Sequence, residues 1–269
     1  MLSFPSVTAV EVTGPRVVHP VETLLPAADA AGFRGVGIDW FSLRDAERRG
    51  VTVESLAESA AALGLTWTDL SALGLGPDAD RDEKVAAAMA RRCAALGIGL
   101  CGLVVSVPLD DAVYGRIARC AEMFSADGVR LALEFVPYTE VRTLDVGRAV
   151  CERVGVEGCG IMVDTLHLMR SGGWAADVTD LDPSELAAVQ IADAVPTVPE
   201  DLPGESRETR LLPGEGAFDF PAFAAALDAI GWSGVISTEV LSARLRTMSA
   251  ALLAEACAVS ARRFFTEPG

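Results

Sequence analysis

Polar side chains close or interrupt short apolar segments at four places in the second half of the sequence. They are Glu134 in LALEF, Asp164 in GIMVD, Gln190 in VQIAD and Glu239 in ISTEV. A carboxylate among apolar neighbours is cut off from water, and burying it without a partner costs several kcal/mol. An arginine could neutralise one such acid, but one cation would satisfy three acids and an amide together.

The donor set predicts which cation would bind. Three carboxylates and a carboxamide offer only oxygen, and magnesium and manganese prefer oxygen ligands. Zinc is disfavoured on this pattern because no histidine is among the four. We therefore expect a divalent metal ion, Mn or Mg, with the ligands Glu134, Asp164, Gln190 and Glu239.

Two further side chains are candidates for contacts with a substrate. His167 follows Asp164 by three residues. A lone histidine is usually a hydrogen-bonded structural residue, as we expect for His19, but a place beside a candidate metal ligand favours a role in the site. Arg210 precedes a PGEG turn that would return the chain toward the strand ends. Its guanidinium could therefore reach a substrate oxygen or a developing enolate.

The elements that must position these residues alternate along the chain. Short apolar segments predict eight strands, at residues 6–12, 34–40, 65–70, 99–105, 129–135, 160–164, 187–192 and 234–240. Amphipathic, alanine-rich stretches predict helices, among them 53–63, 81–96, 111–124, 144–154, 220–230 and 244–265. Eight such units in 269 residues predict a single (β/α)8 TIM barrel domain over residues 1–269, whose active site lies at the carboxyl ends of the strands.

One connection departs from this rhythm. Residues 193–216 (DAVPTVPEDLPGESRETRLLPGEG), after the seventh strand, are charged and rich in proline and glycine. A loop of this length in a compact domain is usually a lid or a binding loop. The second and third predicted strands carry four further residues of interest, Asp39, Trp40, Trp67 and Asp69. These residues could form the walls of a pocket or could be ordinary packing, and both interpretations stay open.

Composition excludes several classes of function. The chain has 38 acidic and 22 basic residues and a formal net charge of −16, which argues against nucleic acid or an anionic membrane as a partner. Without a recognisable signal peptide or membrane span, we expect a cytoplasmic protein that acts on a small molecule. The possibility of a homo-oligomer stays open.

The six cysteines lack C-x-x-C spacing and are predicted to be reduced core thiols. The single lysine, Lys84, lies in a helical stretch, which disfavours a Schiff-base aldolase.

The sequence resembles the xylose isomerase-like (β/α)8 barrels of the sugar phosphate isomerase and epimerase family in the segments LALEF, MVDTLHL, VQIADA, PGEG and STEV. The resemblance spans most of the chain and is strongest in its second half. It implies that the four strand-end residues match the family's metal ligands. It also implies that Glu134 and Glu239 match its pair of acid/base carboxylates, and that His167 and Arg210 match its contacts with substrate oxygens.

The activity implied by this resemblance is that of a divalent-metal-dependent isomerase or epimerase. Its substrate would be a small polyhydroxy carbonyl compound, such as a keto sugar, a sugar phosphate or hydroxypyruvate, converted through an enediolate. Many sugar epimerases of the family carry histidine where this chain has Gln190, and the QIAD segment is more similar to hydroxypyruvate isomerases and 3-dehydroshikimate dehydratases. Two alternatives stay open: a metal-dependent dehydratase of the 3-dehydroshikimate or inosose type, and a non-catalytic binding or partner subunit.

Overall fold

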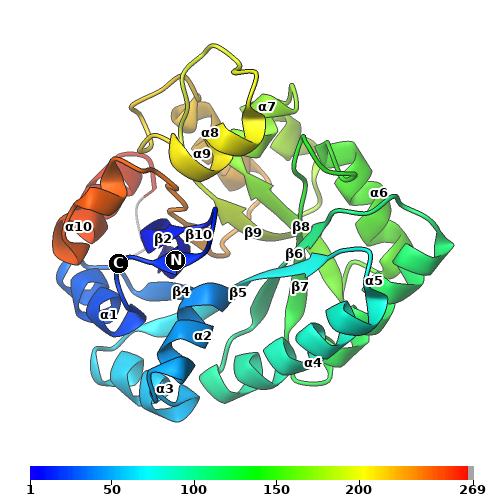
Figure 1. Ribbon diagram of the computed structural model, residues 1–269. Coiled ribbons are helices and arrows are strands. Elements are labelled where there is room, and N and C mark those ends of the chain that lie inside the picture. Colours follow the sequence, from blue (N-terminus) through cyan, green and yellow to red (C-terminus); the bar gives the residue numbers. More distant parts are fainter. Residues whose placement is uncertain (266–269) are drawn as a thin grey trace.

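Eight parallel strands close into a barrel at the centre of the computed structural model, which describes residues 1–265 (Figure 1). Along the chain these strands are β1 (Leu2–Pro5), β4 (Gly35–Asp39), β5 (Thr66–Leu75), β6 (Leu100–Val105), β7 (Arg130–Glu134), β8 (Cys159–Asp164), β9 (Leu186–Gln190) and β10 (Ile236–Ser237). Each strand pairs in parallel with the next, and β10 closes the barrel against β1. The prediction of a (β/α)8 barrel is confirmed; residues 266–269 of the predicted domain lie outside the described residues.

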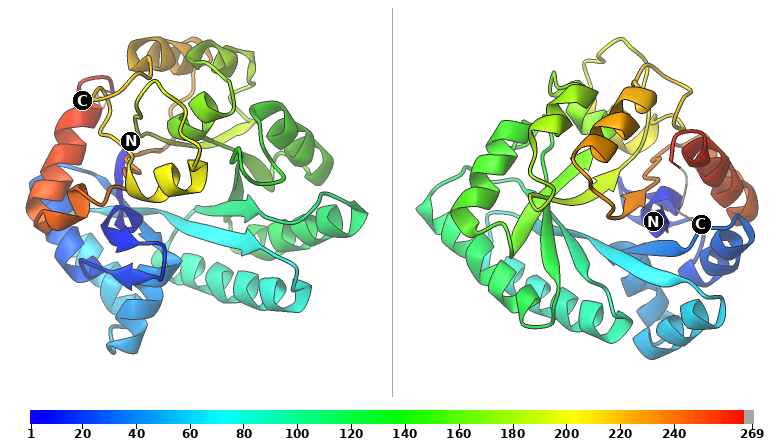
Figure 2. Two further views of the ribbon diagram at one scale, coloured as in Figure 1. Left: turned by 45° about the horizontal axis from the view of Figure 1, so that its top comes forward. Right: turned by 180° about the vertical axis from the view of Figure 1, so that it is seen from behind.

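Helices surround the strands (Figures 1 and 2). They are α1 (Val21–Ala30), α2 (Trp40–Arg48), α3 (Val53–Ala62), α4 (Ala79–Leu96), α5 (Asp111–Ser125), α6 (Leu144–Val154), α7 (Thr165–Arg170), α8 (Leu202–Glu208), α9 (Phe220–Ala229) and α10 (Ala250–Arg262). The shorter elements are the antiparallel pair β2 (Val10–Glu11) and β3 (Arg16–Val17), and the 3-10 helices η1 (Ser6–Ala9), η2 (Ala175–Asp180) and η3 (Leu245–Thr247). Helices α1 and α10 pack side by side although they come from opposite ends of the chain (Figures 1 and 2).

Side-chain caps explain where most helices begin. In every helix from α2 to α10, an Asp, Thr or Ser accepts a hydrogen bond from a backbone N–H of the first turn. Each cap contributes about 1 kcal/mol, and negative charge is favourable at a helix N-terminus. Part of the acid excess is therefore used in capping, by Asp39, Asp78, Asp110, Asp164, Asp201 and Asp219.

The first predicted strand was misplaced. The barrel strand is β1, at residues 2–5, whereas the predicted segment 6–12 begins with the 3-10 helix η1. All four residues of η1 (SVTA) are buried. The pattern that suggested a strand therefore indicated burial, which a buried 3-10 helix shares with a buried strand. The last predicted helix also begins later than expected, at Ala250, because Ser249 caps it there.

The segment 193–216 is folded and includes α8, so it is more than the loop that was predicted. Isolated bridges pair Asp193 with Leu211 and Thr209 with Ser242. The carboxylate of Asp193 is fully buried and accepts hydrogen bonds from the backbone N–H groups of Ala194, Gly214, Gly216 and Phe218. One side chain thereby fixes both ends of the segment against each other.

Packing of the core agrees with the composition. All six cysteines are buried and free, which confirms the predicted core thiols. Among residues 1–265, no helix has the length and apolar character that a membrane crossing requires.

Candidate active site

Strand register brings the predicted ligands to one level of the barrel. Asp164, the last residue of β8, lies opposite Gln190, the last residue of β9. Gln190 in turn lies opposite Ser237 of β10, two residues before Glu239. Glu134 ends β7, the other neighbour of β8. The four predicted ligands therefore reach the same end of the barrel from four successive strands.

Glu134, Asp164 and His167 form a candidate metal-binding triad. One ligand atom from each lies within 4.8 Å of the others, and His167 Nε2 is 3.3 Å from Glu134 Oε1. The D-x-x-H spacing has a local cause, because Asp164 caps α7 and accepts hydrogen bonds from the N–H groups of Leu166 and His167. The cap holds the imidazole one helical turn beyond the strand end. His167, expected to contact a substrate, is thus also within reach of a metal ion.

Gln190 and Glu239 contact each other beside this triad. Gln190 Nε2 donates a hydrogen bond to Glu239 Oε1 at 3.0 Å, and Gln190 Oε1 is buried with no hydrogen-bond partner among residues 1–265. An unsatisfied buried amide oxygen is rare, and a cation is one partner that would satisfy it. Together with the triad, this oxygen makes the residues present a good fit for a divalent metal ion. Because His167 belongs to the triad, the lack of a histidine no longer disfavours zinc.

Arg210 lies fully buried behind these carboxylates. Its Nη1 is 2.6 Å from Asp164 Oδ2 and 3.2 Å from Glu239 Oε2. Its Nε and Nη2 donate to the backbone oxygen and the hydroxyl of Ser206 in α8. The guanidinium therefore neutralises the acids and ties them to α8. The predicted contact between Arg210 and a substrate stays a prediction.

The pKa values of Asp164 and Glu239 shift in opposite directions although both acids contact Arg210. Burial disfavours the charged form of Asp164, but Arg210 and His167 outweigh it and hold the pKa of Asp164 below its ordinary value. Burial raises the pKa of Glu239 to about 8, against the opposing effect of Arg210 and with a further contribution from the negative charges of Glu134 and Asp164. Arg210 Nη1 lies closer to Asp164, at 2.6 Å, than to Glu239, at 3.2 Å.

A cavity of about 300 Å³ opens above these residues. Glu134, His167, Gln190, Arg210 and Glu239 line it, whereas Asp164 is buried beneath. Its remaining wall includes the apolar side chains of Val7 in η1, Phe41 in α2 and Val104 in β6, and of Val12, Val136 and Leu241 in loops. Polar side chains, among them Asp39, Ser71, Ser106 and Thr139, also line it. The cavity thus places a small molecule directly over the candidate metal ligands.

Sequence reasoning missed several residues of this cavity. The Tyr138 ring lines the cavity and packs edge-on against His167 at a centroid distance of 6.0 Å. Ser206 and Arg207 line the cavity from α8. The position of Tyr138, four residues after Glu134 at a strand end, was the available signal. No local pattern singled out Ser206 or Arg207.

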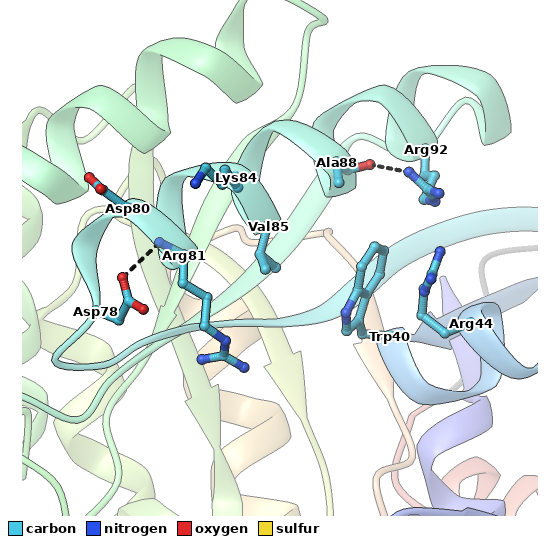
Figure 3. A pocket seen from close by; sticks show the side chains of 9 residues that line it. All are labelled: Trp40, Arg44, Asp78, Asp80, Arg81, Lys84, Val85, Ala88 and Arg92. Carbon is cyan, nitrogen blue, oxygen red and sulfur yellow. Dashed lines mark hydrogen bonds between the residues drawn. The ribbon is translucent and has the colours of Figure 1, made fainter.

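The residues of the second and third strands divide between two places. Asp39 lines the cavity, whereas Trp67 and Asp69 are buried outside its lining. Trp40 lies in a separate groove of about 680 Å³ between α2 and α4, where Figure 3 shows it opposite Arg81. The strand-end carboxylates do not line this second groove.

Comparison with known proteins places the chain in a family. Residues 25–263 match the family model described as xylose isomerase-like TIM barrel. The chain belongs to this family. The predicted resemblance to the xylose isomerase-like barrels is confirmed.

The curated relatives are similar over part of their length. A 3-dehydroshikimate dehydratase from Pseudomonas aeruginosa is 29% identical over 127 residues, which cover 47% of this chain and 20% of that protein. An inosose isomerase from Bacillus subtilis is 32% identical over 117 residues, which cover 42% of this chain and 40% of that protein. The matches therefore span less than half of either relative. Both relatives are enzymes, in agreement with the prediction of an enzyme.

Solved structures share the fold over nearly the whole chain. The IOLI protein with a bound zinc atom superposes with a TM-score of 0.85 at 19% identity, covering 99% of each chain. D-psicose 3-epimerase in the presence of D-fructose superposes with a TM-score of 0.74 at 17% identity, covering 98% of each chain. At these identities the likeness shows the fold alone.

Proposed function

We propose that this xylose isomerase-like barrel is a divalent-metal-dependent isomerase or epimerase of a small polyhydroxy carbonyl compound. The observation that carries the proposal is the convergence of Glu134, Asp164 and His167 to within 4.8 Å at the base of a cavity. A set of metal ligands at the carboxyl ends of barrel strands is typical of an active site in this fold.

Glu134, Asp164, Gln190 and Glu239 would hold the metal ion, and His167 is a fifth side chain within reach. When bound, a divalent cation supplies Lewis acidity that polarises the substrate carbonyl and the adjacent hydroxyl. Manganese and magnesium suit the carboxylate and amide oxygens, and zinc suits the set once His167 is included.

Glu134 and Glu239 are the proposed acid/base pair. They line the cavity from β7 and from the end of β10, two strands that are not neighbours, and so approach a bound substrate from different sides. One carboxylate removes the proton from the carbon beside the carbonyl, and the electron pair moves onto the carbonyl oxygen. In an epimerisation the other carboxyl returns a proton to the opposite face of the same carbon. In an isomerisation it protonates the former carbonyl carbon, while the proton of the adjacent hydroxyl passes to the former carbonyl oxygen, so that the two oxygens exchange roles. Arg210 and Gln190 hold Glu239 in position for this transfer.

A dehydratase is the second candidate, because the chain is similar to a 3-dehydroshikimate dehydratase over 127 residues. The same enolate can expel a β-hydroxyl as water when a carboxyl protonates the leaving oxygen. Elimination from 3-dehydroshikimate yields a conjugated product that absorbs ultraviolet light, whereas isomerisation does not. Product analysis therefore separates the two reactions.

Turnover of 3-ketohexoses, hydroxypyruvate, inosose and 3-dehydroshikimate by the Mn-loaded protein tests the proposal. Glu239→Gln should lower turnover by at least about 100-fold, since the amide cannot transfer the proton. Glu58→Gln, an exposed change on α3, is the matched control and should keep full activity. Full activity of a correctly folded Glu239→Gln variant would exclude the acid/base role. Turnover of none of the four compounds would favour the non-catalytic alternative.

A further inference from the structure

Arg207 is a cation at the cavity without a partner of its own. It lies in α8, three residues before Arg210, and lines the cavity with an exposed side chain. Within residues 1–265 its guanidinium takes part in no ion pair and no hydrogen bond. Its neighbours differ, because Arg170 pairs with Glu205 and Arg246 pairs with Glu208.

We propose that Arg207 binds an acidic group of the substrate, a carboxylate or a phosphate, on the side of the cavity that α8 lines. The inference rests on the proposed function, since it assumes that this cavity holds the substrate. The substrate class is then a keto compound with an acidic substituent, and neutral keto sugars and neutral cyclic polyols are excluded.

The charges of the cavity support an anionic substrate. Glu134, Asp164 and Glu239 are countered by Arg210 and by the two charges of a divalent cation, so the base of the cavity is close to neutral when loaded. The remaining carboxyl group of the lining, Asp39, is buried and accepts hydrogen bonds from the Ser6 hydroxyl and the Ser42 N–H. Arg207 is therefore the exposed charged group of the cavity. A chain with a formal net charge of −16 repels anions at long range, and a local cation is what an anionic substrate requires.

Tyr138 lines the same cavity as Arg207 and contacts the candidate metal-binding triad. Its ring packs edge-on against His167 at a centroid distance of 6.0 Å. Ser206, the residue before Arg207, also lines the cavity and holds Arg210 through its hydroxyl and backbone oxygen. A substrate over the triad therefore shares one cavity with the Arg207 guanidinium.

The rest of the cavity lining carries both apolar and polar side chains. The apolar ones include Val12, Phe41, Val104, Val136 and Leu241, and the polar ones include Asp39, Ser71, Ser106 and Thr139. The lining therefore suits a polyhydroxy compound, and Arg207 adds a positive charge that its neutral polar groups lack.

Calorimetric titration of the Mn-loaded protein tests the assignment with three probes. They are 3-dehydroshikimate with a carboxylate, a ketose phosphate, and inosose as a neutral ring. Arg207→Met should weaken binding of the acidic probe about 10- to 100-fold, because a charge-assisted hydrogen bond is lost, and should leave the affinity for inosose unchanged. Arg207→Lys should restore part of the affinity. Arg48→Met, an exposed change on α2 outside the cavity, should have no effect.

Tighter binding of 3-dehydroshikimate than of the ketose phosphate indicates that Arg207 binds a carboxylate. The opposite order indicates a phosphate. Equal losses for acidic and neutral probes in Arg207→Met, or wild-type protein that binds inosose but neither acidic probe, would overturn the inference. So would a failure to bind any of the three probes. If an acidic probe binds through Arg207 but is not converted, the result counts against the proposed function alone. If the protein converts inosose and Arg207→Met leaves that turnover unchanged, the result counts against this inference alone.

Discussion

Asp164 has two roles that the sequence spacing joins. It is the last residue of β8 and also the cap of α7, so the hydrogen bond that starts the helix fixes where His167 lies. The spacing predicted that these two side chains are close together. It could not predict that the imidazole faces Glu134, because that contact depends on the pairing of β7 with β8, and Glu134 lies 33 residues before His167 in the sequence.

The two histidines allow a matched test of the triad. His167→Gln should weaken binding of Mn or Zn by at least about 10-fold, since one ligand of the set is lost. His19→Gln should leave metal affinity unchanged, because His19 hydrogen-bonds the backbone oxygen of Met248 away from the site. Titration with a fluorescent metal indicator measures both variants. Equal metal affinities in His167→Gln and wild type would remove His167 from the ligand set.

At the scale of the element, the segment 193–216 shows where sequence reasoning reached its limit. Proline and glycine predicted a loop near the site, and α8 does line the cavity. The helix itself was missed because it has seven residues, too few for a clear periodic pattern. Asp193 was read only as part of a motif, whereas its four backbone hydrogen bonds fix the segment.

Gly216 tests how tightly this segment is held. A Cβ at this position would overlap the carbonyl oxygen of Ala194 and the carboxylate of Asp193. Gly216→Ala should therefore loosen the turn, cost about 1–3 kcal/mol of unfolding free energy and speed proteolysis between residues 194 and 217. Gly115→Ala, inside α5, is the control and should be neutral or stabilising by about 0.5–1 kcal/mol. Proteolysis of Gly216→Ala at the wild-type rate would show that the turn tolerates the change.

At the scale of the molecule, hydrophobic periodicity was enough to predict the closed barrel. In a closed parallel barrel the carboxyl ends of all strands lie at the same end of the barrel. The sequence therefore also predicted that the four ligands at those strand ends would lie near one another. The cavity wall was not predictable, because Val12, Phe41 and Leu241 come from connections after three different strands. Their shape depends on tertiary contacts and leaves no local signal in the sequence.

The central claim is that the strand-end residues of this barrel form a catalytic divalent-metal site. Its most direct test is turnover by protein stripped with a chelator, on whichever of the four proposed compounds the loaded protein converts, followed by titration with Mn, Mg and Zn. Turnover should fall at least about 100-fold on stripping and return as about one equivalent of metal is added. Undiminished turnover by the metal-free protein would contradict the claim.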